Sequence, residues 1–250
     1  MKKWKLASPL AALAVWQALA VTGALGRATP SPWDVLKGLY DLAATGLPRG
    51  YHLQGHVAYS LLRVFTGFGI ALVIAVPLGI LMGWSRWFEA AVDPLVEVVR
   101  PVPPLAWLPL ALVWFGLGLG SAAFIIALGA FFPIVLNTVL GVKGVDPRLV
   151  EAARTLGARE GTILRRVLVP GSTPSIITGV RIGMGIAWMT LVAAELIGVK
   201  NGYGLGYMIM TARDLARFDL LVAGILVIGV IGFLADRLIR IVEKRLLRWR

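Results

Sequence analysis

Ionisable side chains that could take part in chemistry are sparse along most of this sequence. Glu195 lies in a long apolar stretch, and if that stretch crosses a bilayer a carboxylate there indicates a pathway or a gate. The alternative is that Glu195, three positions before Gly198, reaches the outer interface. His52 and His56 would share one helix face, but two imidazoles without a third ligand make a weak metal site. We therefore predict no metal centre and keep both hypotheses for Glu195.

A run of prolines marks a second candidate site. Arg100 precedes "PVPPLAWLP", in which Pro101, Pro103 and Pro104 are closely spaced. Such a cluster predicts an unusual helix start whose carbonyl groups would face a passing solute, with Arg100 and Pro104 as candidate pathway residues. The alternative is an ordinary helix start after a loop.

The sequence gives little sign of an enzyme. It has no cysteine, which excludes disulfides and cysteine-based metal or redox chemistry. The phosphate-cradling motif GxxxxGK[ST] does not occur, and we find no set of acids, histidines and a nucleophile that would cluster at one depth. We expect no cofactor, and any ATP to be bound and hydrolysed by a partner subunit.

Composition places the chain in a membrane. Of its 250 residues, 58% are hydrophobic and only 15% are charged, and the mean hydropathy is +0.81. About 20 apolar residues cross the hydrocarbon core as a helix, and residues 101–142 carry no charge but contain the glycine-rich break "FGLGLGS". The sequence predicts an all-α, polytopic membrane protein with six transmembrane helices: 6–26, 64–84, 101–117, 121–141, 175–198 and 218–236.

The distribution of lysine and arginine predicts the orientation. With the N-terminus inside, eighteen of these residues fall in inner segments and seven in outer ones, so both termini should be cytoplasmic. The basic residues are scattered at helix ends, which favours contact with acidic lipid over nucleic-acid binding. The apolar run after "MKKWK" is too long for a signal peptide, so we expect a retained first helix.

The connection 27–63 should lie outside the membrane. Leu53, Val57 and Leu61 recur every four residues, which predicts a helix on the membrane surface. The segment 201–207, "NGYGLGY", is interpreted as an outer turn.

A polar stretch interrupts the apolar sequence between the fourth and fifth predicted spans. Asp146 and Pro147 are typical of a helix start, Gly157 is typical of a helix end, and Pro170 should end a second helix. Small or apolar residues share one face of the first helix: Leu149, Ala152, Ala153 and Leu156. Two hypotheses fit such a knob. It either enters a cleft in a soluble partner or rests on the lipid surface.

Residues 151–170, "EAARTLGAREGTILRRVLVP", resemble the EAA loop of permeases from binding-protein-dependent ABC importers. The family pattern is EAA, three residues, Gly, nine residues, Ile, one residue, Leu-Pro. Matching positions are Glu151, Ala152, Ala153, Gly157 and Pro170, while Val167 and Val169 stand in place of Ile and Leu.

The resemblance covers most of the chain. Four further stretches are similar to the nitrate, sulfonate and taurine branch of these permeases: 60–85, 92–118, 129–138 and 193–209. It implies a type I, MetI-like permease fold, with an N-terminal helix and outer connection in 1–50 and the permease domain in 51–250. It also implies a cytoplasmic coupling loop at 143–172, with six coupling residues: Glu151, Ala152, Ala153, Leu156, Gly157 and Pro170.

The implied function is alternating-access import of a small anion across a bacterial inner membrane. The expected partners are two cytoplasmic ATP-binding subunits, an extracytoplasmic substrate-binding protein and a second permease copy. The sequence does not name the solute. The alternative is a self-sufficient channel or secondary transporter, a class that usually shows internal repeats or several intramembrane ionisable groups.

Overall fold

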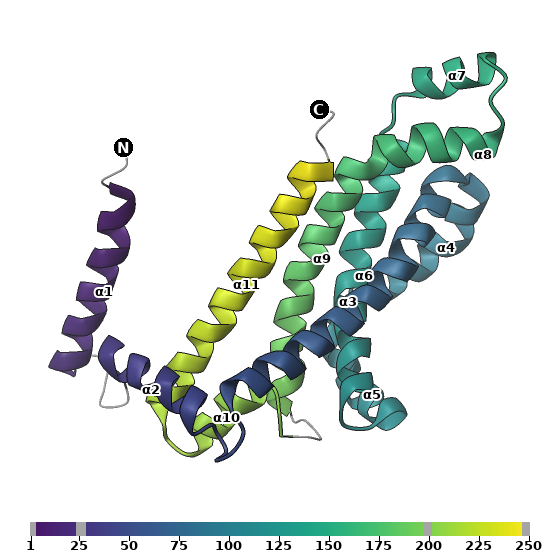
Figure 1. Ribbon diagram of the computed structural model, residues 1–250. Coiled ribbons are helices and arrows are strands. Elements are labelled where there is room, and N and C mark those ends of the chain that lie inside the picture. The colour runs from purple at the N-terminus through teal and green to yellow at the C-terminus, as the bar shows by residue number, and fades with distance from the viewer. Residues whose placement is uncertain (1–3, 24–28, 198–201, 247–250) are drawn as a thin grey trace. The chain divides into compact units, whose positions relative to one another are not determined.

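The computed structural model describes residues 4–23, 29–197 and 202–246, and every regular element in those ranges is a helix (Figure 1). The chain divides into two compact units. The first comprises Met1–Ser60 and Glu195–Ile231, and the second comprises Leu61–Ala194 and Gly232–Arg250. Three long helices contribute to both units: α3 (Leu53–Trp84), α9 (Val169–Ile197) and α11 (Phe218–Leu246).

Four described helices are long and apolar enough to cross a membrane. They are α3, α6 (Leu119–Lys143), the continuous helix Glu160–Ile197 and α11. A bent pair, Arg86–Val99 with Pro104–Phe115, provides a fifth apolar segment. A sixth, Leu10–Thr22, lies in α1 (Trp4–Thr22). The four helices and the bent pair overlap five of the six predicted spans, and Leu10–Thr22 overlaps the first but is a shorter apolar helix.

The third span differs from the prediction of one helix at 101–117. It begins earlier, as α4 (Arg86–Val99), and bends by 85° before the 3₁₀ turn Pro104–Trp107 and α5 (Leu108–Phe115). The break follows from Pro103 and Pro104, which have no N–H to continue the hydrogen-bond ladder of α4. The predicted turn after this span is confirmed, since Gly116 and Gly118 have φ angles of 68° and 145°.

The predicted surface helix around Leu53, Val57 and Leu61 is not a separate element. These residues form the first turns of α3, which has 32 residues. At 1.5 Å per residue such a helix is about 48 Å long and exceeds a hydrocarbon core of about 30 Å. The apolar spacing therefore belongs to the end of a transmembrane helix.

The first unit also contains α2 (Pro32–Ala44) and α10 (Leu205–Asp214). Ser31 begins α2 through a capping box, in which its hydroxyl accepts the Asp34 N–H and its own N–H donates to the Asp34 carboxylate. Gly38 allows α2 to approach α11, because a Cβ at this position would lie 3.1 Å from the Asp219 carbonyl oxygen.

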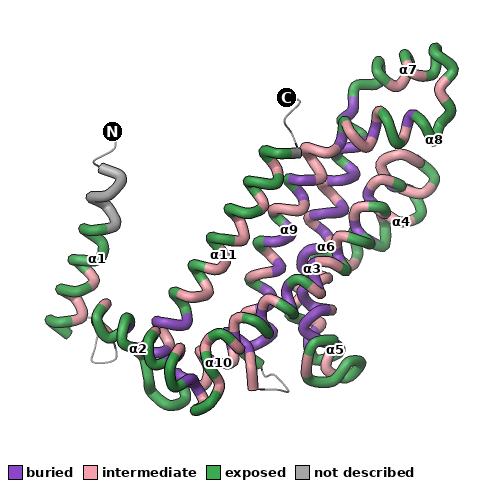
Figure 2. Tube along the Cα trace, in the orientation of Figure 1, coloured by how far each residue is buried: buried purple, intermediate pink, exposed green. Residues whose placement is uncertain are grey.

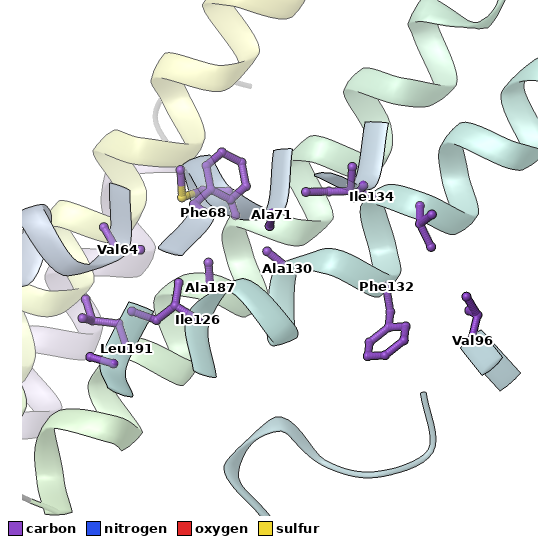
Figure 3. Packing of buried hydrophobic residues seen from close by; sticks show 14 of the residues in the cluster. Val64, Phe68, Ala71, Val96, Ile126, Ala130, Phe132, Ile134, Ala187 and Leu191 are labelled. Atoms are coloured by element: carbon purple, nitrogen blue, oxygen red, sulfur yellow. The ribbon is translucent and has the colours of Figure 1, made fainter. Parts of the chain in front are cut away.

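The core of the second unit is built around α6, whose residues are largely buried (Figure 2). Apolar side chains of α3, α6 and α9 meet there (Figure 3), among them Val64, Phe68, Ala130, Ile134, Ala187 and Leu191. Glycines let the helices approach closely. A Cβ at Gly83 of α3 would lie 2.6 Å from Val142 Cβ, and one at Gly183 of α9 would lie 2.9 Å from Ile134 Cγ1.

Candidate functional site

The start of α7 (Pro147–Thr155) is fixed by local chemistry, as predicted. The carboxylate of Asp146 accepts the Arg148 N–H at 2.9 Å, and Pro147 occupies the first helical position. This cap satisfies one of the amide groups that have no partner inside the helix.

The end of α7 is a Schellman motif around Gly157. The Gly157 N–H donates to the Arg154 carbonyl at 2.9 Å and the Ala158 N–H to the Ala153 carbonyl at 3.0 Å. Gly157 has a φ of 77°, and a Cβ there would meet nothing within 4 Å. The requirement for glycine is therefore conformational rather than steric.

The second helix of the loop does not end at Pro170, in contrast to the prediction. It starts as α8 (Glu160–Ile163), continues through a π turn at Leu164–Leu168 and runs directly into α9. In the π turn the Val169 N–H donates to the Leu164 carbonyl, five residues back. This wider turn leaves room for the proline ring beside the preceding carbonyl groups, and Pro170 has no N–H to leave unpaired.

α7 presents its surface to the surroundings, and none of its residues is buried (Figure 2). Glu151 and Ala152 are exposed, and Ala153 is half-buried. Two apolar side chains stand out on this loop, Leu149 with 56% of its surface exposed and Leu156 with 87%. Leu149 and Leu156 are therefore apolar side chains that another molecule could cover.

The base of the loop is anchored. Val142, Val145 and Leu168 form a buried cluster, against which Val150 of α7 and Trp84 at the end of α3 pack. An ion pair also joins the two arms of the loop, since Arg154 Nε donates to Glu160 Oε1 at 3.1 Å. The knob is therefore a packed extension of the helical core.

The candidate pathway residues Arg100 and Pro104 flank the 85° bend between α4 and α5. Arg100 is exposed at the C-terminal cap of α4, and Pro104 begins the 3₁₀ turn. Within the described part of the chain, Trp107 Nε1 is buried without a hydrogen-bond partner. Sequence analysis did not single out Trp107, although it follows the predicted proline cluster.

Glu195 lies in the first unit and is 1% exposed, so its carboxylate is enclosed by protein. Its carboxylate accepts the Ser60 hydroxyl at 2.8 Å and the Gly206 N–H at 2.9 Å. The Ser60 oxygen in turn accepts the Leu205 N–H at 2.9 Å. Glu195 thus joins the ends of α3 and α9 to the start of α10, and Ser60 is a partner that the sequence did not indicate.

The two histidines also serve backbone groups. His56 is fully buried, with Nδ1 3.0 Å from the Gly204 nitrogen and Nε2 3.0 Å from the Leu47 carbonyl oxygen. His52 Nδ1 lies 3.2 Å from the Ala43 carbonyl oxygen. Among the described residues no group of three potential metal ligands occurs.

In the predicted outer turn, Asn201 lies outside the described residues, and Tyr203 stacks on Tyr59 at 5.1 Å between ring centroids.

The predicted coupling residues lie together on one loop of the second unit. Five of them, including Glu151 and Gly157, lie on α7 or the turn after it, and Pro170 lies at the base of the same loop. Arg100 and Pro104 belong to the same unit but lie at the bend, whereas Glu195 belongs to the first unit.

Comparison with known proteins agrees with this arrangement. The family described as "binding-protein-dependent transport system inner membrane component" matches residues 75–248. A putative ABC transporter permease protein of Methanocaldococcus jannaschii is 46% identical over 246 residues, which is 98% of this chain and 91% of that protein. The taurine transport system permease protein of Escherichia coli is 40% identical over 223 residues, which is 88% and 79% of the two chains.

A solved structure shows the same fold. A chain of the methionine ABC transporter MetNI, in an inward-facing conformation, superposes with a TM-score of 0.64 at 21% identity, covering 77% of this chain and 93% of that one. The family match spans more than half of the sequence and the relatives align over most of it. This multi-pass, all-helical chain therefore belongs to the family of inner-membrane permease components of binding-protein-dependent ABC transport systems.

Proposed function

We propose that this permease forms, with a second copy, the translocation pathway of an ATP-driven importer, and that α7 docks on a cytoplasmic ATP-binding subunit. The observation that carries the proposal is the surface of α7. It is capped at both ends and anchored at its base, yet it leaves Leu149 and Leu156 exposed. Both leucines belong to a knob that projects beyond the helical core (Figure 1), a position in which a soluble partner could cover them.

The connection between α7 and the fifth span supports a role of this segment as a lever that transmits movement of α7 to α9. Residues Glu160–Ile197 form one continuous helix, so the loop leads into the fifth span without a flexible joint. The Arg154–Glu160 ion pair and the contact of Val150 with the buried cluster tie α7 to this helix. A movement of the docked α7 would therefore displace α9, as expected of a rigid element with two arrangements.

The bend between α4 and α5 is the proposed pathway element. Prolines free carbonyl groups from the helical ladder there, and Arg100 supplies a positive charge suited to an anion. Trp107 adds a buried N–H that a passing anion could accept. Glu195 has hydrogen-bond partners within the protein and carries the charge that would repel an anion, which supports a positioning role.

The partners and orientation follow from the family and from the charges. We infer two ATP-binding subunits, an extracytoplasmic substrate-binding protein and a homodimer of this chain, with both termini cytoplasmic. Residues 1–50 would add a peripheral helix and connection, and 51–250 would form the permease domain. ATP is expected only on the partner subunits.

For the solute, a small sulfonate anion is the best-supported class. The relative in Escherichia coli is named for taurine, an aminosulfonate, and aligns over 88% of this chain. The nitrate branch of the sequence resemblance makes nitrate the second anion to test. A self-sufficient channel or secondary transporter would carry the solute without an ATPase, and the same uptake assay tests this alternative.

The direct test compares two exposed leucines that the expected topology places on opposite sides of the membrane. Leu156→Glu should weaken co-purification with the ATP-binding subunit and reduce ATP-driven taurine uptake into proteoliposomes, because a charge replaces an apolar docking contact. Leu215→Glu is the control, since Leu215 is 58% exposed at the end of α10. Equal effects of the two substitutions, or uptake without any ATPase, would refute the proposal.

A further inference from the structure

A groove of about 690 Å³ in the second unit is lined by Arg181 of α9 and by seven residues of α11, and no residue of α7 lines it. Four cations line it, Arg181, Arg237, Arg240 and Lys244, against two acids, Asp236 and Glu243. The groove therefore carries more positive than negative charge, and nothing in the proposed coupling mechanism uses it.

Asp236 holds two of the arginines in place. Arg181 Nε donates to Asp236 Oδ1 at 2.9 Å, and Arg240 Nε donates to Asp236 Oδ2 at 2.8 Å. Each arginine donates to Asp236 through its Nε alone. Across the residues that the structure describes, the terminal guanidinium nitrogens of both arginines make no hydrogen bond. The side chains are 36% and 52% exposed, so these nitrogens are accessible. Planar guanidinium groups whose terminal N–H groups are available can donate two hydrogen bonds to the oxygens of a phosphate.

The groove lies where both helices change from charged to apolar sequence. On α9 the charge-free run 182–194 begins directly after Arg181, and on α11 the charge-free run 220–235 ends directly before Asp236. The two helices are in contact there, because a Cβ at Gly232 would lie 2.9 Å from Trp188 Nε1. This level corresponds to the headgroup region of a bilayer.

An apolar wall adjoins the cations on the membrane side. Phe233 lines the groove with 58% of its surface exposed, and the Arg237 guanidinium lies 5.3 Å from its ring centroid. A ligand with a phosphate at one end and a hydrocarbon chain at the other would satisfy both parts. Free phosphate would use only the cationic part.

We propose that this groove binds the phosphate headgroup of an acidic phospholipid in the leaflet that faces α7, with Arg181 and Arg240 as the principal ligands. The inference rests on the contacts of α9 and α11 and holds whether or not α7 docks on an ATPase. Bound lipid would add a bridge between two transmembrane helices that already meet through Gly232 and Trp188 and through the Asp236 carboxylate.

Native mass spectrometry of the full-length, delipidated protein tests the proposal with phosphatidylglycerol and phosphatidylcholine as probes. The unmodified chain should retain phosphatidylglycerol preferentially. Arg181→Gln with Arg240→Gln should lower its affinity roughly 25-fold, the product of about fivefold for each cation near an acidic lipid. If the double variant does not fold, Arg240→Gln alone should lower it about fivefold.

A charge-matched control separates this groove from general surface charge. Arg165→Gln with Arg166→Gln removes the same charge from two exposed arginines of the π turn and should leave lipid retention unchanged. Equal losses in the two double variants would overturn the proposal, as would equal retention of both lipids. Displacement of phosphatidylglycerol by inorganic phosphate would show that the groove binds free anions, and would overturn the proposal that its ligand is a lipid.

Discussion

At the scale of single residues, Gly157 has the strictest local requirement in the loop. Its φ of 77° lies in the left-handed region, and it supports the two hydrogen bonds that end α7. An L-residue with a Cβ pays about 1–2 kcal/mol to adopt this conformation. The direction in which α7 leaves its last turn depends on this one backbone angle.

Gly157→Ala is therefore expected to raise the Kd for the ATP-binding subunit about fivefold or more, since the helix end must distort. Gly157→Asn should have a smaller effect, because asparagine tolerates the left-handed region. The matched control is Gly161→Ala, at a position in α8 where a Cβ meets nothing and alanine favours the helix. Titration of the purified subunits gives the Kd, and a Kd unchanged by Gly157→Ala would show that this turn is not needed for docking.

A substitution of Glu195 can distinguish a role in positioning helices from a role in the translocation pathway. In Glu195→Gln one buried donor, the Ser60 hydroxyl or the Gly206 N–H, loses its carboxylate acceptor. The expected cost is about 1–3 kcal/mol, visible as a lower Tm in detergent. Glu97→Gln, on the exposed surface of α4, should leave the Tm unchanged. A normal Tm with lost taurine uptake would instead place Glu195 in the pathway.

At the scale of elements, the sequence was informative where local chemistry decides the outcome. The caps of α7 were predictable because Asp146, Pro147 and Gly157 act on adjacent backbone groups. The continuation through Pro170 was not, because it depends on a π turn whose hydrogen bonds span five residues and leave no simple residue pattern. The bend at Pro103 was indicated by prolines, but its angle and the helix before it were not.

The close approach of the transmembrane helices is visible in the sequence as glycines four residues apart. Gly79 and Gly83 of α3 are four residues apart, and both face α6. Gly83→Val should destabilise the fold by about 1–3 kcal/mol, because a Cβ would lie 2.6 Å from Val142 Cβ. Gly69→Val is the control in the same helix, where a Cβ meets nothing within 4 Å. Thermal unfolding of both variants is the measurement, and equal Tm values would contradict this account of the packing.

At the scale of the whole molecule, apolar runs and the EAA resemblance predicted the family and the number of apolar segments, and both the fold and the family are confirmed. The polar contacts of the first unit could not be predicted. Ser60 meets Glu195 across 135 positions of sequence, and His56 meets Gly204 across 148. Such pairs depend on the tertiary fold, and no local pattern reports them.

We expect α7 to lie in the cytoplasm and to be covered by the ATP-binding subunit. The chain has no cysteine, so Ala152→Cys introduces a unique label site on the exposed surface of α7. A membrane-impermeant maleimide should label Cys at this position in inside-out vesicles, and addition of the ATP-binding subunit should protect it. Labelling from the outside, or labelling that the ATP-binding subunit leaves unchanged, would contradict the account.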